Sequence, residues 1–145
     1  MSLIFHSITS LIILIFLISS IIIAINALIY NKQYDKKHKK YFLITFIFSH
    51  IQLLLGIVWY ITSPYYQLLT TGEMGKIMKN ADTRLLTIEH PITMIIAISL
   101  ITLGWISFKK QTIDYNKYKT IAIYYTIALI LILSRIPWGQ WDMKY

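Results

Sequence analysis

Long apolar segments alternate with short polar ones along this 145-residue chain. Four apolar runs stand out, and they cover Leu3–Tyr30, Tyr41–Thr62, Arg84–Phe108 and Thr120–Trp138. Each run reaches the roughly 18 residues that an α-helix needs to cross a hydrocarbon core about 30 Å thick, because each helical residue rises about 1.5 Å. The pattern predicts an all-α fold, an integral membrane four-helix bundle that forms a single domain over residues 1–145.

Composition agrees with this class and excludes several others. Hydrophobic residues make up 57% of the chain, a larger fraction than a soluble domain of this size needs. With no cysteine, the chain cannot form disulfides, thioether-linked c-type haem or cysteine-ligated iron–sulfur clusters. The sequence also lacks a Walker loop, a dinucleotide fingerprint, a Gly-x-Ser-x-Gly motif and a zinc-type His-Glu-x-x-His motif, which excludes the soluble enzymes that use them.

The basic residues predict how the helices are oriented. Nine of the fourteen lie in two short loops, five in the first and four in the second: Lys32, Lys36, Lys37, Lys39, Lys40, Lys109, Lys110, Lys117 and Lys119. Short lysine-rich loops stay in the cytoplasm, so both termini and the segment Ser63–Thr83 should face the periplasm. Within that segment, Glu73–Asn80 is expected to form a short amphipathic helix. Lysines that set topology and attract anionic lipid headgroups account for the net charge of +8 without a nucleic-acid partner.

Small and polar residues recur at steps of three and four within each run, which places them on one face of each helix. Lipid is as apolar as leucine, so such faces mark helix contacts inside a membrane bundle. The expected inward faces are His6, Ser10, Ile13, Leu17, Ser20, Ala24 and Ala27; Ser49, Gln52, Gly56 and Trp59; His90, Thr93, Ala97, Ile101 and Gly104; and Thr120, Tyr124, Ala128, Leu131 and Arg135.

Six ionisable residues near or within the runs need an explanation, because a charge or imidazole at membrane depth is costly unless it is paired or functional. They are His6, His50, Arg84, Glu89, His90 and Arg135. With the N-terminus outside, five of them gather at the outer side, whereas His50 lies near the bilayer centre. Pro91 offers an alternative start for the third helix besides the one near Arg84, because proline fits the first helical turn and disfavours helical geometry in the residue before it.

Histidines on facing helices suggest a b-type haem, whose iron accepts two imidazoles and needs no cysteine. By depth, His6 and His90 are the better-matched iron ligands, and His50 is the alternative ligand. Arg84 and Arg135 would hold the propionates.

Each of these residues also has a structural interpretation. His6 could be a solvated residue at the start of the chain, and His50 could be a core histidine bonded to backbone or a hydroxyl. His90 could cap its helix or pair with Arg84 or Arg135, and His38 is expected to be a solvated loop residue.

Three segments carry a family resemblance over nearly the whole chain. They are His50-Ile-Gln-Leu-Leu-Leu-Gly-Ile, Arg84-Leu-Leu-Thr-Ile-Glu-His-Pro and the closing Ala-Leu-Ile-Leu-Ile-Leu-Ser-Arg-Ile-Pro-Trp. They resemble a family of small four-helix membrane proteins from Bacteroidetes labelled cytochrome b, which implies a non-covalent haem b. His6 matches the histidine that opens the first helix of that family, whereas the arginine and tryptophan that follow it there are absent here.

The architecture is also similar to one half of haem A synthase. Each half is a four-helix bundle with histidines on its first and third helices and a Gln-x-x-Leu-Gly stretch on its second. Here the stretch Gln52-Leu-Leu-Leu-Gly56 is one residue longer. This likeness favours His6 with His90 as the ligand pair.

The sequence thus favours a b-type cytochrome of the bacterial inner membrane, an electron-transfer protein in or near the respiratory chain rather than an enzyme. Its expected partners are the lipid bilayer and a quinone or another redox protein. A homo-oligomer and a subunit of a larger complex are both compatible with the sequence. The alternative function is a cofactor-free accessory or assembly subunit, and a small transporter is disfavoured because the chain has no inverted repeat.

Overall fold

The structure is a computed structural model that describes residues 2–140. Within this range four helices are long and apolar enough to cross a membrane, which confirms the predicted number of spans. They contain α1 (Ser2–Ile29), α2 (Lys36–Thr62), α6 (His90–Lys110) and α7 (Asp114–Ser134). The chain is therefore an all-α, multi-pass membrane protein.

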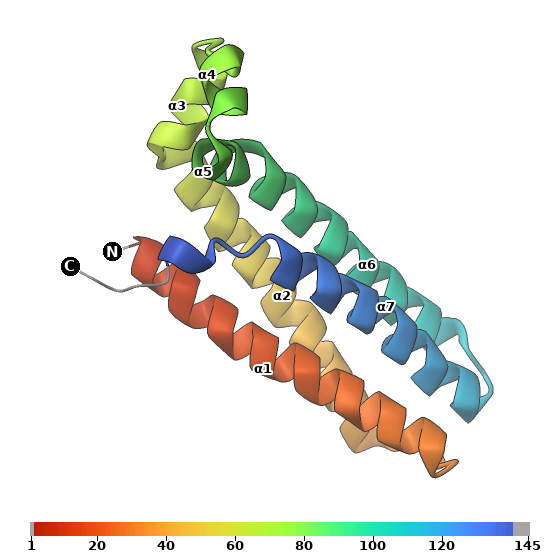
Figure 1. The fold of residues 1–145 in the computed structure, drawn as a ribbon. Coiled ribbons are helices and arrows are strands. Elements are labelled where there is room, and N and C mark those ends of the chain that lie inside the picture. The colour runs from red at the N-terminus through yellow and green to blue at the C-terminus, as the bar shows by residue number, and fades with distance from the viewer. Residues whose placement is uncertain (1, 141–145) are drawn as a thin grey trace.

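The four long helices form a closed bundle (Figure 1). Helix α1 packs against α2 and α7, and α6 packs against α7 and α2, so α1 and α6 are diagonal partners across the bundle axis. The outer surface carries many exposed aliphatic side chains, among them Ile15, Leu54, Val58 and Ile130. An apolar exterior of this kind is suited to contact with lipid tails.

The two ends of the bundle differ in composition. One end, called here the histidine end, holds the start of α1, the end of α2, the start of α6 and the end of α7 (Figure 1). The opposite end, called the lysine end, holds the connections from α1 to α2 and from α6 to α7. Of the nine lysines that the sequence assigned to these loops, Lys32 lies in the first connection and the other eight lie in the adjoining ends of α2, α6 and α7.

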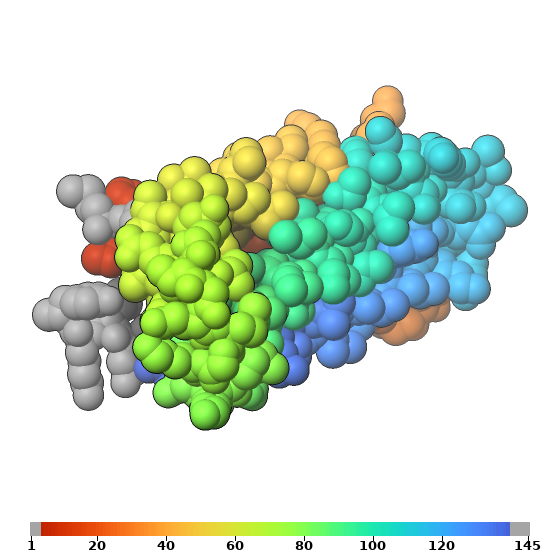
Figure 2. Space-filling view, turned by 90° about the horizontal axis from the view of Figure 1, so that it is seen from above, coloured from red at the N-terminus to blue at the C-terminus, as the bar shows by residue number. Residues whose placement is uncertain are grey.

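Short helices connect α2 to α6 at the histidine end. They are α3 (Pro64–Thr70), α4 (Met74–Lys79) and α5 (Ala81–Arg84), and α4 lies where the sequence predicted a short helix. Figure 2 shows this segment as a yellow-green group of atoms over one end of the bundle. Ile77 of α4 is fully buried, which fixes α4 against its neighbours.

The third span begins before Pro91, which confirms the predicted range starting near Arg84 and rules out the alternative start at Pro91. The third candidate span runs without a break from Ala81 to Lys110, and His90 has helical angles of φ −62° and ψ −52°. A π-helical turn, η1 (Leu85–Glu89), joins α5 to α6. The wider turn accommodates a proline that lacks an N–H, so the helix continues through Pro91.

Two other helices, α2 and α7, have boundaries that differ from the predicted ranges. Helix α2 begins at Lys36 rather than near Tyr41, because the Asp35 side chain caps it by accepting a hydrogen bond from the Lys37 N–H at 2.7 Å. Helix α7 begins at Asp114 and ends at Ser134, three residues before Pro137. A short 3₁₀ turn, η2 (Trp138–Gln140), follows it.

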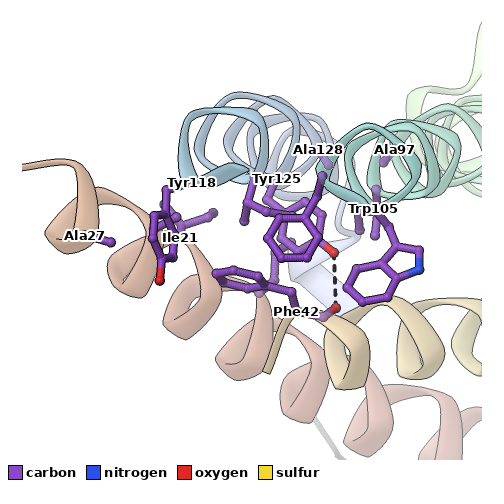
Figure 3. Packing of buried hydrophobic residues seen from close by; sticks show 13 residues of the cluster. Ile21, Ala27, Phe42, Ala97, Trp105, Tyr118, Tyr125 and Ala128 are labelled. Carbon is purple, nitrogen blue, oxygen red and sulfur yellow. Dashed lines mark hydrogen bonds between the residues drawn. The ribbon is translucent and has the colours of Figure 1, made fainter. Parts of the chain in front are cut away.

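The best-packed part of the core lies toward the lysine end, where aromatic side chains fill the bundle axis (Figure 3). Phe42 contacts the rings of Phe108, Tyr118 and Tyr125 edge to face. The Tyr125 hydroxyl donates a hydrogen bond to the backbone oxygen of Phe42 at 3.2 Å, the dashed line in Figure 3. The hydroxyl of this buried tyrosine therefore has a hydrogen-bond partner.

The inward face of α1 agrees with the predicted stripe, since Ile13, Leu17, Ser20, Ala24 and Ala27 are all buried. The inward face of α7 was predicted correctly only at Ala128. Its buried residues are Tyr118, Ile121, Tyr125 and Ala128, whereas Thr120, Tyr124 and Leu131 are half-buried and Arg135 is exposed. Large tyrosines occupy the bundle axis here because they find backbone partners on other helices.

Hydrogen bonds to Tyr118 connect α7 to the start of α2 at the lysine end. Its hydroxyl accepts a hydrogen bond from the Asp35 N–H at 3.2 Å and lies 2.8 Å from Nδ1 of His38. His38 belongs to the first turns of α2 and is half-buried, so its interpretation as a solvated loop residue was wrong. The Tyr34 N–H also donates to the Asp114 carboxylate at 2.9 Å, which links the two loops.

Candidate functional site

Two histidines on diagonal helices face each other at the histidine end. The ring centres of His6, on α1, and His90, on α6, lie 6.4 Å apart, and the ring planes are inclined by 80°. They are 84 positions apart in the sequence, so only the packing of the bundle brings them together. His6 is the fifth residue of α1 and His90 the first of α6, and because both helices start at the histidine end and run in the same direction, these positions lie at the same end of the bundle.

The two rings line a cavity of about 240 Å³ inside this end of the bundle. Most of its wall is apolar, with contributions from Leu14 of α1, Leu53 of α2, Met94 of α6 and Ile132 of α7. An engineered apolar cavity of about 150 Å³ binds benzene, so this space is large enough for part of an organic ligand. Met94 is flexible and could make the space larger by changing rotamer.

His90 is held in place by the end of α7. Its Nδ1–H donates a hydrogen bond to the backbone oxygen of Arg135 at 2.8 Å. This hydrogen bond leaves the lone pair of Nε2 available to a ligand, as the outer partners of metal-binding histidines do. The π-helical turn η1 precedes His90 directly, and π-turns within helices are frequent at functional sites.

His6 is held by the second helix. The Gln52 amide nitrogen lies 2.8 Å from the backbone oxygen of His6 and 3.0 Å from its Nδ1. Gly56, one turn further along α2, leaves room for the ring, since a Cβ at that position would lie 3.1 Å from Cε1 of His6. Gln52 and Gly56 together fix the location of this imidazole against α2.

Three charged residues lie beside the site and neutralise one another in part. One carboxylate oxygen of Glu89 lies 2.8 Å from Nε of Arg84, and the other lies 3.5 Å from Nε of Arg135. Arg84 also donates to the backbone oxygen of Met78 at 3.0 Å. Two guanidinium groups and one carboxylate leave a net charge of +1 next to His90.

His50 does not reach the cavity. It lies between α2 and α6, where its Nδ1–H donates to the backbone oxygen of Phe46 at 2.7 Å and its Nε2 lies 3.1 Å from the Thr102 hydroxyl. Both ring nitrogens are thus engaged with the protein. Its structural interpretation, a core histidine bonded to backbone and a hydroxyl, matches its position.

The arrangement of His6 and His90 meets the main geometric requirement of a metal between two imidazoles. Nitrogen ligands at about 2.0–2.1 Å on opposite sides of one ion place their ring centres about 6 Å apart. His90 already offers Nε2, and the net positive charge nearby suits the propionates of a haem. No group of three or more His, Asp or Glu side chains that could hold a bare metal ion occurs within residues 2–140.

The cavity is smaller than the macrocycle, so side chains around it would have to move outward on binding. Pockets for organic ligands span about 300–1,000 Å³, just above the volume seen here. The wall is apolar, and Met94 can change rotamer without leaving a polar group unpaired. Two imidazoles, an apolar wall and adjacent positive charge are chemical features that a haem site would need, and the cavity would have to widen to hold the macrocycle.

Sequence reasoning placed Gln52 and Gly56 on the inward face of α2 but gave them no role at His6. The signal was their spacing of four residues, which puts both side chains on the side of α2 that meets His6. Thr9 was missed altogether, although its hydroxyl lies 2.5 Å from the Gln52 amide oxygen. Its partner is 43 positions away, so no local pattern could indicate it.

Comparison of the chain with protein-family models, with curated proteins and with solved structures found no match.

Proposed function

We propose that the chain is a b-type cytochrome that holds one haem between His6 and His90. The observation that carries the proposal is the separation of 6.4 Å between the two ring centres on diagonal helices. It agrees with the spacing of about 6 Å that two imidazoles need around one metal ion. The family of small Bacteroidetes membrane proteins that the sequence resembles implies the same cofactor.

The residues of the chain have separate tasks in this proposal. His90, held through Nδ1 by Arg135, presents Nε2 to the iron, and His6 presents its ring from the opposite side. Arg84 and Arg135 attract the propionates while Glu89 keeps the two cations together. The haem supplies reversible one-electron transfer, and the apolar side chains around it exclude water.

The proposal includes an orientation in the bacterial inner membrane. The lysine end would face the cytoplasm, because short basic loops stay there, and the histidine end with both termini would face the periplasm. A haem at that end would exchange electrons with a quinol or a redox protein near the periplasmic surface. His50 lies away from the cavity, so it takes no part in ligation in this proposal.

A second function, that of a cofactor-free accessory or assembly subunit, is favoured by one observation. Glu89 bridges Arg84 and Arg135, so the charged residues at the histidine end are compensated in part without any ligand. In this function His6 and His90 would serve only to join helices through Gln52 and the end of α7.

A visible spectrum separates the two functions. The protein is made in a haem-replete host, purified in detergent, and measured as a dithionite-reduced minus oxidised difference, with haem quantified as the pyridine haemochrome. We expect one b-type haem per chain. A colourless, folded protein would overturn the cytochrome and leave the accessory function.

Histidine variants then test the ligands. We expect His90→Ala to lose the haem, whereas His50→Gln, the matched control at a histidine outside the cavity, should retain it. Circular dichroism of each variant shows whether the helices are intact. A folded His90→Ala protein with full haem occupancy would remove His90 from the ligand set.

A further inference from the structure

Pro91 leaves the backbone oxygen of Thr87 without its usual helical donor. In an α-helix each N–H bonds to the carbonyl four residues earlier, so residue 91 would donate to Thr87. Proline has no N–H, and its ring crowds that same carbonyl. Thr87 is only 1% exposed, so another part of the protein has to supply a donor to this oxygen.

Tyr60 supplies this donor from another span. Its hydroxyl donates a hydrogen bond to the backbone oxygen of Thr87 at 2.6 Å, at the short end of the range for O–H···O bonds. Tyr60 lies two residues before the end of α2 at Thr62, and Thr87 lies in the π-helical turn η1 directly before α6. The contact thus ties the end of α2 to the start of α6.

The hydroxyl of Thr87 shows that η1 departs from α-helical geometry at a cost. Elsewhere in the described helices, threonine hydroxyls donate to the carbonyl four residues earlier, as at Thr9, Thr45, Thr62, Thr70, Thr102 and Thr120. The Thr87 hydroxyl is buried and makes no hydrogen bond within residues 2–140. A buried hydroxyl without a partner is unfavourable, so contacts with the rest of the protein have to hold η1 in this form.

We propose that Tyr60 is a positioning residue, whose hydroxyl replaces the N–H that Pro91 lacks and thereby holds η1 and the first turn of α6 in place. His90 follows η1 directly, and its N–H bonds to the backbone oxygen of Leu85 across the turn. The position of His90 in the cavity wall therefore depends on Tyr60. The inference goes beyond the proposed function and does not rest on it, because it concerns contacts within the ligand-free chain.

The first test observes the carbonyl of Thr87 directly, by NMR of the haem-free protein in detergent micelles. Threonine labelled with ¹³C at the carbonyl and isoleucine labelled with ¹⁵N select the Thr–Ile pairs, of which Thr87–Ile88 is one. A hydrogen bond moves a carbonyl carbon downfield. We expect Tyr60→Phe, which keeps the ring and removes the hydroxyl, to move the Thr87 signal upfield.

Tyr65→Phe is the matched control for this measurement. Tyr65 is also half-buried, and its hydroxyl makes no hydrogen bond within the part of the chain that the structure describes. The same chemical change at Tyr65 should leave the Thr87 signal in place. A Thr87 signal that does not move in Tyr60→Phe would overturn the proposal.

The second test measures hydrogen exchange of single amides along α6. Loss of one hydrogen bond between membrane helices should speed exchange of the His90 N–H by about 3- to 20-fold in Tyr60→Phe. The N–H of Thr102, further along α6, should exchange at its natural rate. Equal acceleration at His90 and Thr102 would mean a general loss of stability and would contradict a local role for Tyr60.

The third test gives residue 91 an N–H again. In the natural background, Tyr60→Phe should raise the equilibrium constant for unfolding by about 3- to 20-fold in a sodium dodecyl sulfate titration. In the Pro91→Ala background it should have little effect, because the N–H of residue 91 can then serve the Thr87 carbonyl. Equal effects in the two backgrounds would show that Tyr60 does not replace the missing donor. If Pro91→Ala does not fold, the carbonyl signal and the exchange rates of Tyr60→Phe decide.

Thr87→Val separates the carbonyl of Thr87 from its hydroxyl. Valine keeps the shape of the side chain and removes the unpartnered hydroxyl, so this variant should unfold at a higher detergent fraction than the natural protein. Tyr60→Phe should have its full effect in this background, because the backbone oxygen is still present. An effect that disappears there would mean that Tyr60 acts through the hydroxyl, and the proposal would be wrong.

Discussion

The backbone oxygen of Arg135 lies 2.8 Å from Nδ1 of His90, so the end of the last long helix orients a histidine at the start of the third. Carbonyl groups in the last turn of a helix have no partner within that helix and need one elsewhere. His90 supplies one through its ring N–H. The contact uses the backbone of Arg135, so it does not depend on the side chain at that position.

Topology gives the first prediction, and the absence of natural cysteines makes it simple to test. Thr71→Cys places a thiol on the exposed segment at the histidine end, and Thr112→Cys places one between α6 and α7 at the lysine end. We expect a membrane-impermeant maleimide to label residue 71 in intact spheroplasts and residue 112 after the membrane is permeabilised. The reverse pattern would contradict the orientation proposed above.

The partly exposed carboxylate of Glu89 gives the second prediction. Glu89→Gln removes the charge that lies between Arg84 and Arg135, and it should lower the free energy of unfolding by about 1 kcal/mol, because exposed ion pairs contribute modestly. Glu73→Gln is the control, since Glu73 pairs with the largely exposed Lys76. Its expected effect is below about 0.5 kcal/mol in an equilibrium unfolding titration with sodium dodecyl sulfate. Equal losses for the two variants would argue against a special role for Glu89.

A buried hydroxyl pair joins α1 to α2 and gives the third prediction. Ser20 Oγ lies 2.8 Å from Thr45 Oγ1, and both residues are fully buried. Ser20→Ala should destabilise the protein by about 0.5–1.5 kcal/mol, the usual contribution of a polar contact between membrane helices. Ser99→Ala, an exposed serine that bonds only within its own helix turn, should change stability by less. A double-mutant cycle with Thr45→Val measures the interaction free energy between the two hydroxyls. A value of zero would show that this contact does not stabilise the bundle.

Close approach of α6 and α7 gives the fourth prediction. A Cβ on Gly104 would lie 2.7 Å from Cβ of Tyr124, an atom too close to the backbone to move away. Gly104→Ala should therefore push the helices apart and lower stability by about 1–3 kcal/mol. Gly75→Ala is the control, because nothing lies within 4 Å of its added Cβ and alanine favours a helix. A Gly104→Ala protein that unfolds at the same point as the natural one would contradict this packing.

Parts of the fold followed directly from the sequence. The stripe of α1 identified its buried face because small residues at steps of three and four, such as Ser20, Ala24 and Ala27, mark contacts in lipid. The same rule identified Ala128 on α7 but missed the other buried residues of that helix. There Tyr118 and Tyr125 are buried, since their hydroxyls reach backbone groups about 83 positions away that the sequence pattern does not reveal.

The candidate site was predictable in outline and not in detail. Matching the depth of histidines on two helices that start at the same end of the bundle pairs His6 with His90, and the structure brings their rings together. The start of the third span near Arg84 is confirmed, whereas the alternative start at Pro91 fails because the π-helical turn η1 precedes His90 and the helix continues through Pro91. The position of His50 was left open by the sequence, and its contacts with Phe46 and Thr102 place it outside the cavity.

The sequence by itself determined that the chain makes four spans and that its basic loops gather at one end, because span length and loop charge are local properties that need no knowledge of neighbours. Tertiary structure decided which histidines meet, which tyrosines are buried, and that Gln52 donates to His6. Those relationships depend on how four helices rotate about their axes and slide past one another. Packing and hydrogen bonds between distant residues set that rotation and sliding, and no short stretch of the chain encodes them.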